Sequence, residues 1–199
     1  MDRFLFTLLA TMVISEEDLR FTHVYKQGYD TSCGVAVTAS LLNTYWNIPV
    51  TEADLYQSLI LDRLDRTAED ADGYTVSLFA VAEYLKTHDV QSRAYKMDWE
   101  TLEDTLKKGY GPVLIHYEKP EPHFALLTHI EGDYAFVADP ARGFGMVDYR
   151  WFMKNYSGNA LLTASRTAVK DTEALETVNA GGKERLNRLE ILARRGRIR

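Results

Sequence analysis

Four side chains of this sequence have the types and the order needed for acyl transfer, and the one that would attack is a cysteine. Cys33 is the only cysteine among 199 residues, and an apolar stretch with helical spacing follows it directly. The free N–H groups and the dipole at a helix N-terminus stabilise a thiolate, the form of cysteine that attacks a carbonyl. The sequence therefore predicts that Cys33 is a nucleophile. The alternative is that this lone cysteine is a small buried hydrophobe.

A candidate base and a group to orient it lie far downstream. His123 is on one predicted strand, and Asp139 ends the next strand, 16 residues later. A nucleophile, a histidine and a carboxylate on neighbouring elements are what a Cys-His-Asp triad requires. Gln27 lies six residues before Cys33, where its side-chain N–H could stabilise an oxyanion. The alternatives are turn initiation for Asp139, because Asp-Pro is a common turn pair, and a surface loop for Gln27.

The other four histidines are weaker candidates for the base. His129 lies six residues after His123, so in a regular strand both side chains face the same side of the sheet. We therefore expect His129 to be the substitute if His123 is not the base. His116 lies on a predicted central strand, and we expect His23 and His88 to be solvated.

Periodicity divides the chain into a helical first half and a strand-rich second half. After an extended segment over residues 21–26, the predicted helices cover residues 33–46, a segment from Thr51, 77–87, and a short segment from Asp98 to Gly109, with a loop over 62–73. The predicted strands cover 112–117, 123–130, 134–138 and 161–163, with a tight hairpin at 131–133. Helices followed by an antiparallel sheet predict an α+β fold, with a cleft between the nucleophile's helix and the sheet.

These residues resemble the double-glycine, or bacteriocin-leader-processing, cysteine peptidases, which have a papain-like fold. The resemblance extends from Tyr25 to Ala164 and is carried by Gln27, Cys33-Gly34, Asp72-Gly73-Tyr74, His123-Phe124, Asp139-Pro140-Ala141-Arg142-Gly143, Trp151-Phe152 and Ser157-Gly158. It is closer to stand-alone members, such as those encoded with functional-amyloid secretion systems, than to members fused to transporters. No membrane or ATPase region follows the matching segment, and Ser32 replaces the acidic residue that directly precedes the cysteine in several members.

The resemblance implies a cysteine endopeptidase with the triad Cys33, His123 and Asp139 and with Gln27 in the oxyanion hole. It also implies a peptide or protein substrate with a small-residue, Gly-Gly-like cleavage site, and an association with a secretion or export system. Two other functions remain open from the residues. An acyltransferase would use the same thiol, because acyl-enzyme chemistry serves both reactions. A non-catalytic module would only hold an export substrate.

Composition limits the partners. A hydrophobic content of 46% over 199 residues predicts one domain with a substantial core. The net charge of −6 argues against nucleic acid as a partner. One cysteine excludes an internal disulfide framework, and the scattered histidines lack the spacing of zinc ligands. We expect no metal and no cofactor.

The N-terminal residues predict export. Residues 4–14 form an apolar run after Arg3 that is too short to span a bilayer but has the length of a signal-peptide core. We expect residues 1–15 to be a signal peptide, residues 16–165 to form the peptidase domain, and the mature chain to be periplasmic or otherwise exported, with no transmembrane span. The alternative is that this run is the first helix or strand of a cytoplasmic protein.

The C-terminal residues 166–199 form a polar extension beyond the resemblance. Residues 183–199 carry seven basic and two acidic side chains, and an apolar stripe of leucines follows this basic segment. We expect a helical or partly disordered, solvated tail that could dock on the acidic domain, on anionic lipid or on a secretion partner. Gly181-Gly182 predicts a flexible break between two helical pieces, with self-cleavage after this pair as the alternative.

Overall fold

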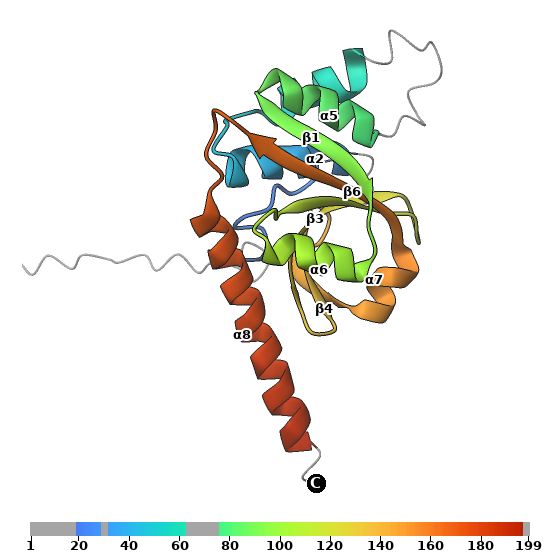
Figure 1. Cartoon of the computed structure of the whole chain (residues 1–199), viewed down its shortest axis with the longest axis vertical. Coiled ribbons are helices and arrows are strands. Elements are labelled where there is room, and N and C mark those ends of the chain that lie inside the picture. The colour runs from blue at the N-terminus through green and yellow to red at the C-terminus, as the bar shows by residue number, and fades with distance from the viewer. Residues whose placement is uncertain (1–18, 29–31, 63–75, 197–199) are drawn as a thin grey trace, which may run out of the picture.

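A computed structural model describes residues 19–28, 32–62 and 76–196 of the chain (Figure 1). The predicted signal peptide, the loop at 63–73 and the segment Asp72-Gly73-Tyr74 lie outside the described residues. No helix within the described ranges is both long enough and apolar enough to cross a membrane.

The described part of the chain has helices first, then a sheet, then a long final helix. The helices are α2 (Cys33–Ala39), the π-helical turn η1 (Ser40–Tyr45), α3 (Glu52–Tyr56), the π-helical turn η2 (Gln57–Leu61), α5 (Leu78–Thr87), α6 (Trp99–Lys107), α7 (Tyr149–Asn155) and α8 (Thr172–Gly196). The strands are β1 (Val90–Lys96), β2 (Val113–Tyr117), β3 (His123–Glu131), β4 (Tyr134–Asp139), β5 (Gly143–Asp148) and β6 (Tyr156–Ser165).

The six strands form one antiparallel sheet in the order β1-β6-β2-β3-β4-β5. The strand β3, which begins at His123, is therefore internal, and β1 and β5 are the two edges. In Figure 1, α2 and α5 lie in the upper part of the molecule, α6 lies in front of the sheet, α7 lies at the lower right, and α8 runs along the left side and extends past the sheet.

Two hydrophobic clusters hold the helices on the sheet. One cluster joins α2, η1, α5 and α8 to one face, through residues such as Leu41, Phe124 and Phe136. The other joins α6 and α7 to the opposite face, through residues such as Leu102 and Phe152. Because successive residues of a strand point to opposite faces, the central strands β2, β3 and β4 contribute residues to both clusters.

Helices α5 and α6 begin and end close to the residues that the sequence predicts. The Ser77 hydroxyl accepts from the backbone N–H of Ala80 at 3.1 Å, and Asp98 accepts from that of Thr101 at 2.9 Å, which caps the N-termini of α5 and α6. Gly109, with φ of 82°, follows α6 in the left-handed conformation that favours glycine.

Three local predictions are wrong. Residues 21–24 form a turn and not an extended segment. The edge strands β1 and β5 were not predicted: only Val90 of β1 is buried, and β5 contains two glycines, so neither has strong strand periodicity. The last strand, β6, spans ten residues instead of the three predicted.

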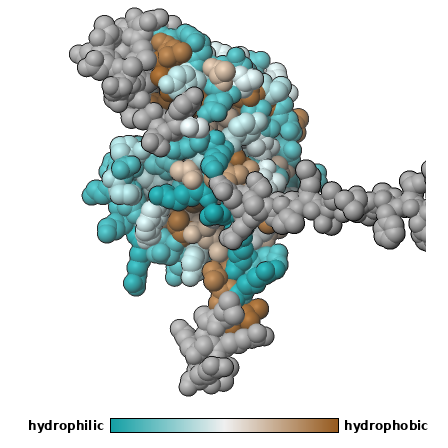
Figure 2. Space-filling view, turned by 180° about the vertical axis from the view of Figure 1, so that it is seen from behind, coloured by the Kyte–Doolittle hydropathy of each residue, from teal (hydrophilic) through white to brown (hydrophobic). Residues whose placement is uncertain are grey.

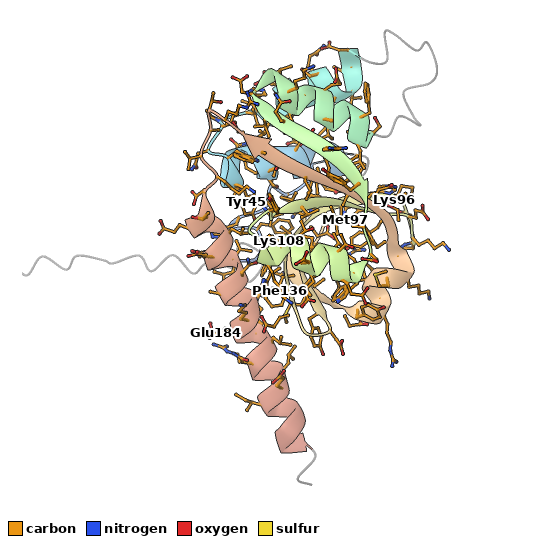
Figure 3. The ribbon with its side chains drawn as sticks, in the orientation of Figure 1. Tyr45, Lys96, Met97, Lys108, Phe136 and Glu184 are labelled. Carbon is orange, nitrogen blue, oxygen red and sulfur yellow. The ribbon has the colours of Figure 1, made fainter. Side chains whose placement is uncertain are left out.

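The C-terminal extension is a continuous helix docked on the domain. Gly181-Gly182 lies inside α8, so the predicted flexible break is wrong. Val178 and Leu186 are buried, and a Cβ on Gly182 would lie 2.7 Å from the Phe136 ring, so the helix packs closely on the sheet at this point. Figure 3 shows Phe136 between the sheet and α8.

The docked and the projecting parts of α8 differ. The backbone N–H of Asp171 donates to Tyr45 O at 2.8 Å and its carboxylate caps the first turn of α8, which fixes the start of the helix. Toward the other end, Leu189 and Ile191 are 53% and 50% exposed. On the face drawn in Figure 2, hydrophilic residues predominate over the domain, and hydrophobic ones lie on the projecting part of the helix.

Candidate active site

Cys33 is the first residue of α2, and its thiol is partly buried. The position after it is tightly packed. A Cβ built on Gly34 would lie only 2.5 Å from Cβ of Val76, so no larger residue fits without movement. Since α2 also packs against β3, the nucleophile candidate lies where the helical part of the molecule meets the sheet.

His123, the first residue of β3, is bonded to Asp139, the last residue of β4. Its Nε2–H donates to Oδ1 of Asp139 at 2.9 Å, and the two side chains are 17% and 10% exposed. Because the Asp139 carboxylate takes up Nε2, the other ring nitrogen, Nδ1, is the one available to the Cys33 thiol.

The Asp139 carboxylate is held by three further donors in the turn that follows β4. Oδ1 accepts from the backbone N–H groups of Ala141 at 2.8 Å and Arg142 at 3.2 Å, and Oδ2 accepts from Arg142 Nη1 at 3.1 Å. The turn predicted from Asp-Pro and the orienting carboxylate therefore coexist, because the turn supplies the donors that fix the carboxylate.

The electrostatics couple the three groups. Burial alone would raise the pKa of the Cys33 thiol, but hydrogen bonding to His123 and to the Phe124 backbone, the His123 charge and the Gly34 backbone together lower it. Burial alone would lower the pKa of His123, but the bonds and charges of Asp139 and Cys33 raise it to about 9. Burial likewise opposes ionisation of Asp139, yet the His123 bond and charge and the Ala141 N–H hold its pKa below the usual value. All three shifts favour the charged form of the group concerned, which is the direction that a thiolate–imidazolium pair requires.

Gln27 lies on the same side of the molecule as His123. Its backbone N–H donates to Pro140 O at 2.9 Å, which ties its segment to the turn after Asp139. Its side chain lines a hollow together with His123, and the buried Oε1 has no hydrogen-bond partner among the described residues. Gln27 and His123 therefore border the same hollow, and the oxyanion role of Gln27 stays a prediction.

The two alternative histidines lie elsewhere. The pairing of β3 with β4 shifts register between Leu127 and His129, so the alternation of faces is broken there. His129 is opposite Phe136 in the strand pairing and its ring contacts the Phe136 ring at a tilt of 56°, on the α8 face; it also bonds Glu131 at 2.9 Å. The prediction that His123 and His129 face the same side is wrong because of this bulge. His116 stacks on Phe124, and burial lowers its pKa.

Sequence reasoning missed two supporting residues. Arg142 was part of the matching motif but had no assigned role. The only sign in the sequence of its contact with Asp139 is that it follows this carboxylate by three residues. Val76, which packs against Gly34, had no signal, because the contact joins segments 42 residues apart in the chain.

Comparisons with known proteins identify the family and the fold. The model of the Peptidase C39 family matches residues 22–168. Two proteins named probable functional amyloid protease FapD are similar to this chain. The one from Pseudomonas aeruginosa is 28% identical over 76% of this chain and 64% of its own length. The one from Pseudomonas fluorescens is 25% identical over 73% of this chain and 62% of its own length. The chain thus spans less than two thirds of the length of these relatives.

Solved structures show the same fold. A double glycine motif protease from an AMS/PCAT transporter, in complex with the leader peptide, has a TM-score of 0.59 and 23% identity, over 71% of this chain and 90% of that one. The peptidase domain of Streptococcus ComA has a TM-score of 0.60 and 18% identity, over 72% and 98%. The predicted α+β, papain-like fold and the resemblance to double-glycine peptidases are confirmed.

Proposed function

This chain belongs to the Peptidase C39 family, and from that premise we propose that it is a cysteine endopeptidase. Cys33 is the nucleophile, His123 the acid and base, Asp139 the residue that orients His123, and Gln27 a donor of the oxyanion hole. The catalytic unit is the papain-like domain of residues 16–165.

The contact chain from Cys33 through His123 to Asp139 is the observation that carries the proposal. Each of the three side chains has a pKa shifted toward its charged form, although burial opposes the charge in each case. A structural cysteine in an apolar site has the opposite shift, because burial then acts unopposed. The arrangement therefore supports catalysis over the buried-hydrophobe alternative.

The chemistry follows from the positions of the protons. The Cys33 thiolate attacks the scissile carbonyl carbon, and the resulting oxyanion is stabilised by the Gln27 side-chain N–H and a backbone N–H at the start of α2. His123 donates its proton to the leaving nitrogen, the C–N bond breaks, and a thioester remains on Cys33. His123 then accepts a proton from water as the water attacks the thioester, which releases the acid and restores the thiolate. Asp139 keeps the ring oriented throughout.

The substrate we propose is a secreted peptide or a secretion-system protein, cleaved after a Gly-Gly-like site. The relatives named functional amyloid proteases and the fold shared with a double glycine motif protease support this class. Export of the mature chain after removal of residues 1–15 is part of the same proposal, with a periplasmic location.

Synthetic peptides with a central Gly-Gly pair in varied sequence contexts test the proposal. We expect the purified protein to cleave a subset of them after the pair, and the Cys33→Ala variant to cleave none, as followed by mass spectrometry. Cleavage that persists in Cys33→Ala would contradict the proposal. Binding without cleavage would favour a substrate-holding module, and transfer to an added amine in place of water would favour an acyltransferase.

A further inference from the structure

A groove made of two adjacent hollows lies between His123 and the edge strand β5. Its first part, of about 310 Å³, is lined by Gln27 and His123 among others, and its second part, of about 290 Å³, follows β5. The two parts share Tyr117, Arg142 and Trp151, so they lie next to each other. Cys33 lines neither part.

We propose that this groove binds the segment that leaves from the substrate, and that it selects leaving segments with acidic side chains. This inference rests on the proposed function and deepens it by naming the part of the substrate that is recognised. When the peptide bond breaks, the acyl half stays on Cys33 and the amine half departs past His123, which protonates its nitrogen. A hollow that contains His123 and not Cys33 is therefore on the path of the leaving half.

The charge of the groove indicates the chemistry of its occupant. Lys119 and Arg142 line the first part, and Arg20 and Arg185 line the second. The acidic groups are Glu121 and Asp139. Asp139 is paired with His123 and Arg142, which leaves the cations Lys119, Arg20 and Arg185 beside the one carboxylate of Glu121. The whole chain has a net charge of −6, so a concentration of cations in one groove is a local feature that fits an acidic ligand.

The edge strand indicates that the occupant is extended. Residues 143–147 of β5 all line the second part, and a Cβ on Gly145 would meet no atom of the described residues within 4 Å. An edge strand presents backbone groups that an incoming extended segment can pair with. Arg185 already donates to the Phe144 carbonyl at 3.4 Å, so α8 closes one end of the groove.

Two buried polar atoms in the groove have no partner among the described residues. They are the hydroxyl of Tyr117, whose side chain is almost completely buried, and Nε of Arg20. Buried polar groups without partners are uncommon in folded proteins, and each costs free energy. Both atoms are buried, so a carboxylate or carbonyl of the leaving segment reaches them only if nearby side chains move.

Binding to the inactive Cys33→Ala variant tests the inference without turnover. The probes are two fluorescent peptides that begin with acetyl-Gly-Gly and continue with alternating glutamate and serine in one, and alternating lysine and serine in the other. We expect the glutamate peptide to bind about fivefold more tightly in fluorescence anisotropy, the order expected for a few exposed ion pairs, with a preference that falls as salt is added. Non-specific attraction to this acidic chain would favour the lysine peptide instead.

Charge reversals locate the effect. In the Cys33→Ala background we expect Arg185→Glu and Lys119→Glu each to weaken binding of the glutamate peptide about two- to threefold. The matched control is Arg188→Glu on the same helix as Arg185, because Arg188 is exposed, pairs with Glu184 and lies outside the groove. Equal or tighter binding of the lysine peptide, no binding of either peptide, or the same loss in the control as in the groove variants would overturn the inference.

The failure of this inference is distinct from the failure of the proposed function. If the active protein cleaves glutamate and lysine peptides equally well, the groove is not selective although the peptidase function stands. If Cys33 proves unreactive while the glutamate peptide still binds in the groove, the peptidase function fails and a binding role for acidic segments remains.

Discussion

The two sides of the candidate site are held in position by different forces. Cys33 is positioned by packing, because α2 is pressed against β3 and Gly34 leaves no space toward Val76. His123 is positioned by hydrogen bonds, through Asp139 and the donors of the turn that follows it. A substitution on the sheet side should therefore abolish activity and leave the fold intact. A substitution on the helix side should instead lower the stability of the fold.

The largest expected effect is the loss of activity when His123, on the side of the site held by hydrogen bonds, is replaced. We expect His123→Ala to lower kcat/KM about 10²–10⁴-fold on a cleaved peptide, because it removes the acid and base and the main cause of the lowered Cys33 pKa. His129→Ala is the matched control and should retain activity, since His129 contacts Phe136 and Glu131 on another part of the sheet. A loss in His129→Ala equal to that in His123→Ala would contradict the assignment of the base.

A smaller effect is expected on the packed side. We expect Gly34→Ala to reduce the free energy of unfolding by about 1–3 kcal/mol, because its Cβ would lie 2.5 Å from Cβ of Val76. Urea denaturation measures the change, and Gly145→Ala is the control, since its Cβ would meet no described atom within 4 Å. Equal stability of the two variants would mean that packing does not position α2.

The smallest effect concerns the packing of α8. Gly181→Ala should stabilise the protein by up to about 1 kcal/mol through helix propensity, because a Cβ there meets no described atom within 4 Å. Gly182→Ala gains the same propensity but places a Cβ 2.7 Å from the Phe136 ring, so we expect no net gain or a loss of about 1–2 kcal/mol. Thermal unfolding of the two variants compares them directly. A gain in both would show that α8 is not docked in solution.

The helices and the central strands were predictable because their signals are local. The apolar spacing after Cys33, the capping residues Ser77 and Asp98 and the short hairpin at 131–133 each determine their element within a few residues. The edge strand β1 was not predictable, because only its first residue is buried and no alternation remains to detect. The continuity of α8 was also missed, because two glycines weaken a helix locally and the compensating contact with Phe136 is tertiary.

The grouping of the three side chains was predictable from the sequence, but the contacts that support them were not. Cys33, His123 and Asp139 have the residue types and spacing that the chemistry needs, and the structure places them together. The contact of Val76 with Gly34 and the groove along β5 depend on segments that meet only in the folded chain. The bulge that turns His129 to the other face leaves no mark in the sequence, so regular alternation was the wrong assumption there.

Alkylation of Cys33 by iodoacetamide as a function of pH tests the central claim that the thiol is activated. The chain has no other cysteine, so labelling reports this site alone. The thiolate fraction rises with pH through the thiol pKa, so the lowered pKa predicts rapid labelling below the ordinary midpoint of about 8.5. In His123→Ala, burial raises the pKa of the Cys33 thiol and the main group that lowers it is gone, so the pH midpoint of labelling should move upward. Each pH unit of that movement should slow labelling near neutral pH about tenfold. A midpoint at the ordinary value that the substitution leaves unchanged would contradict an ion pair between Cys33 and His123.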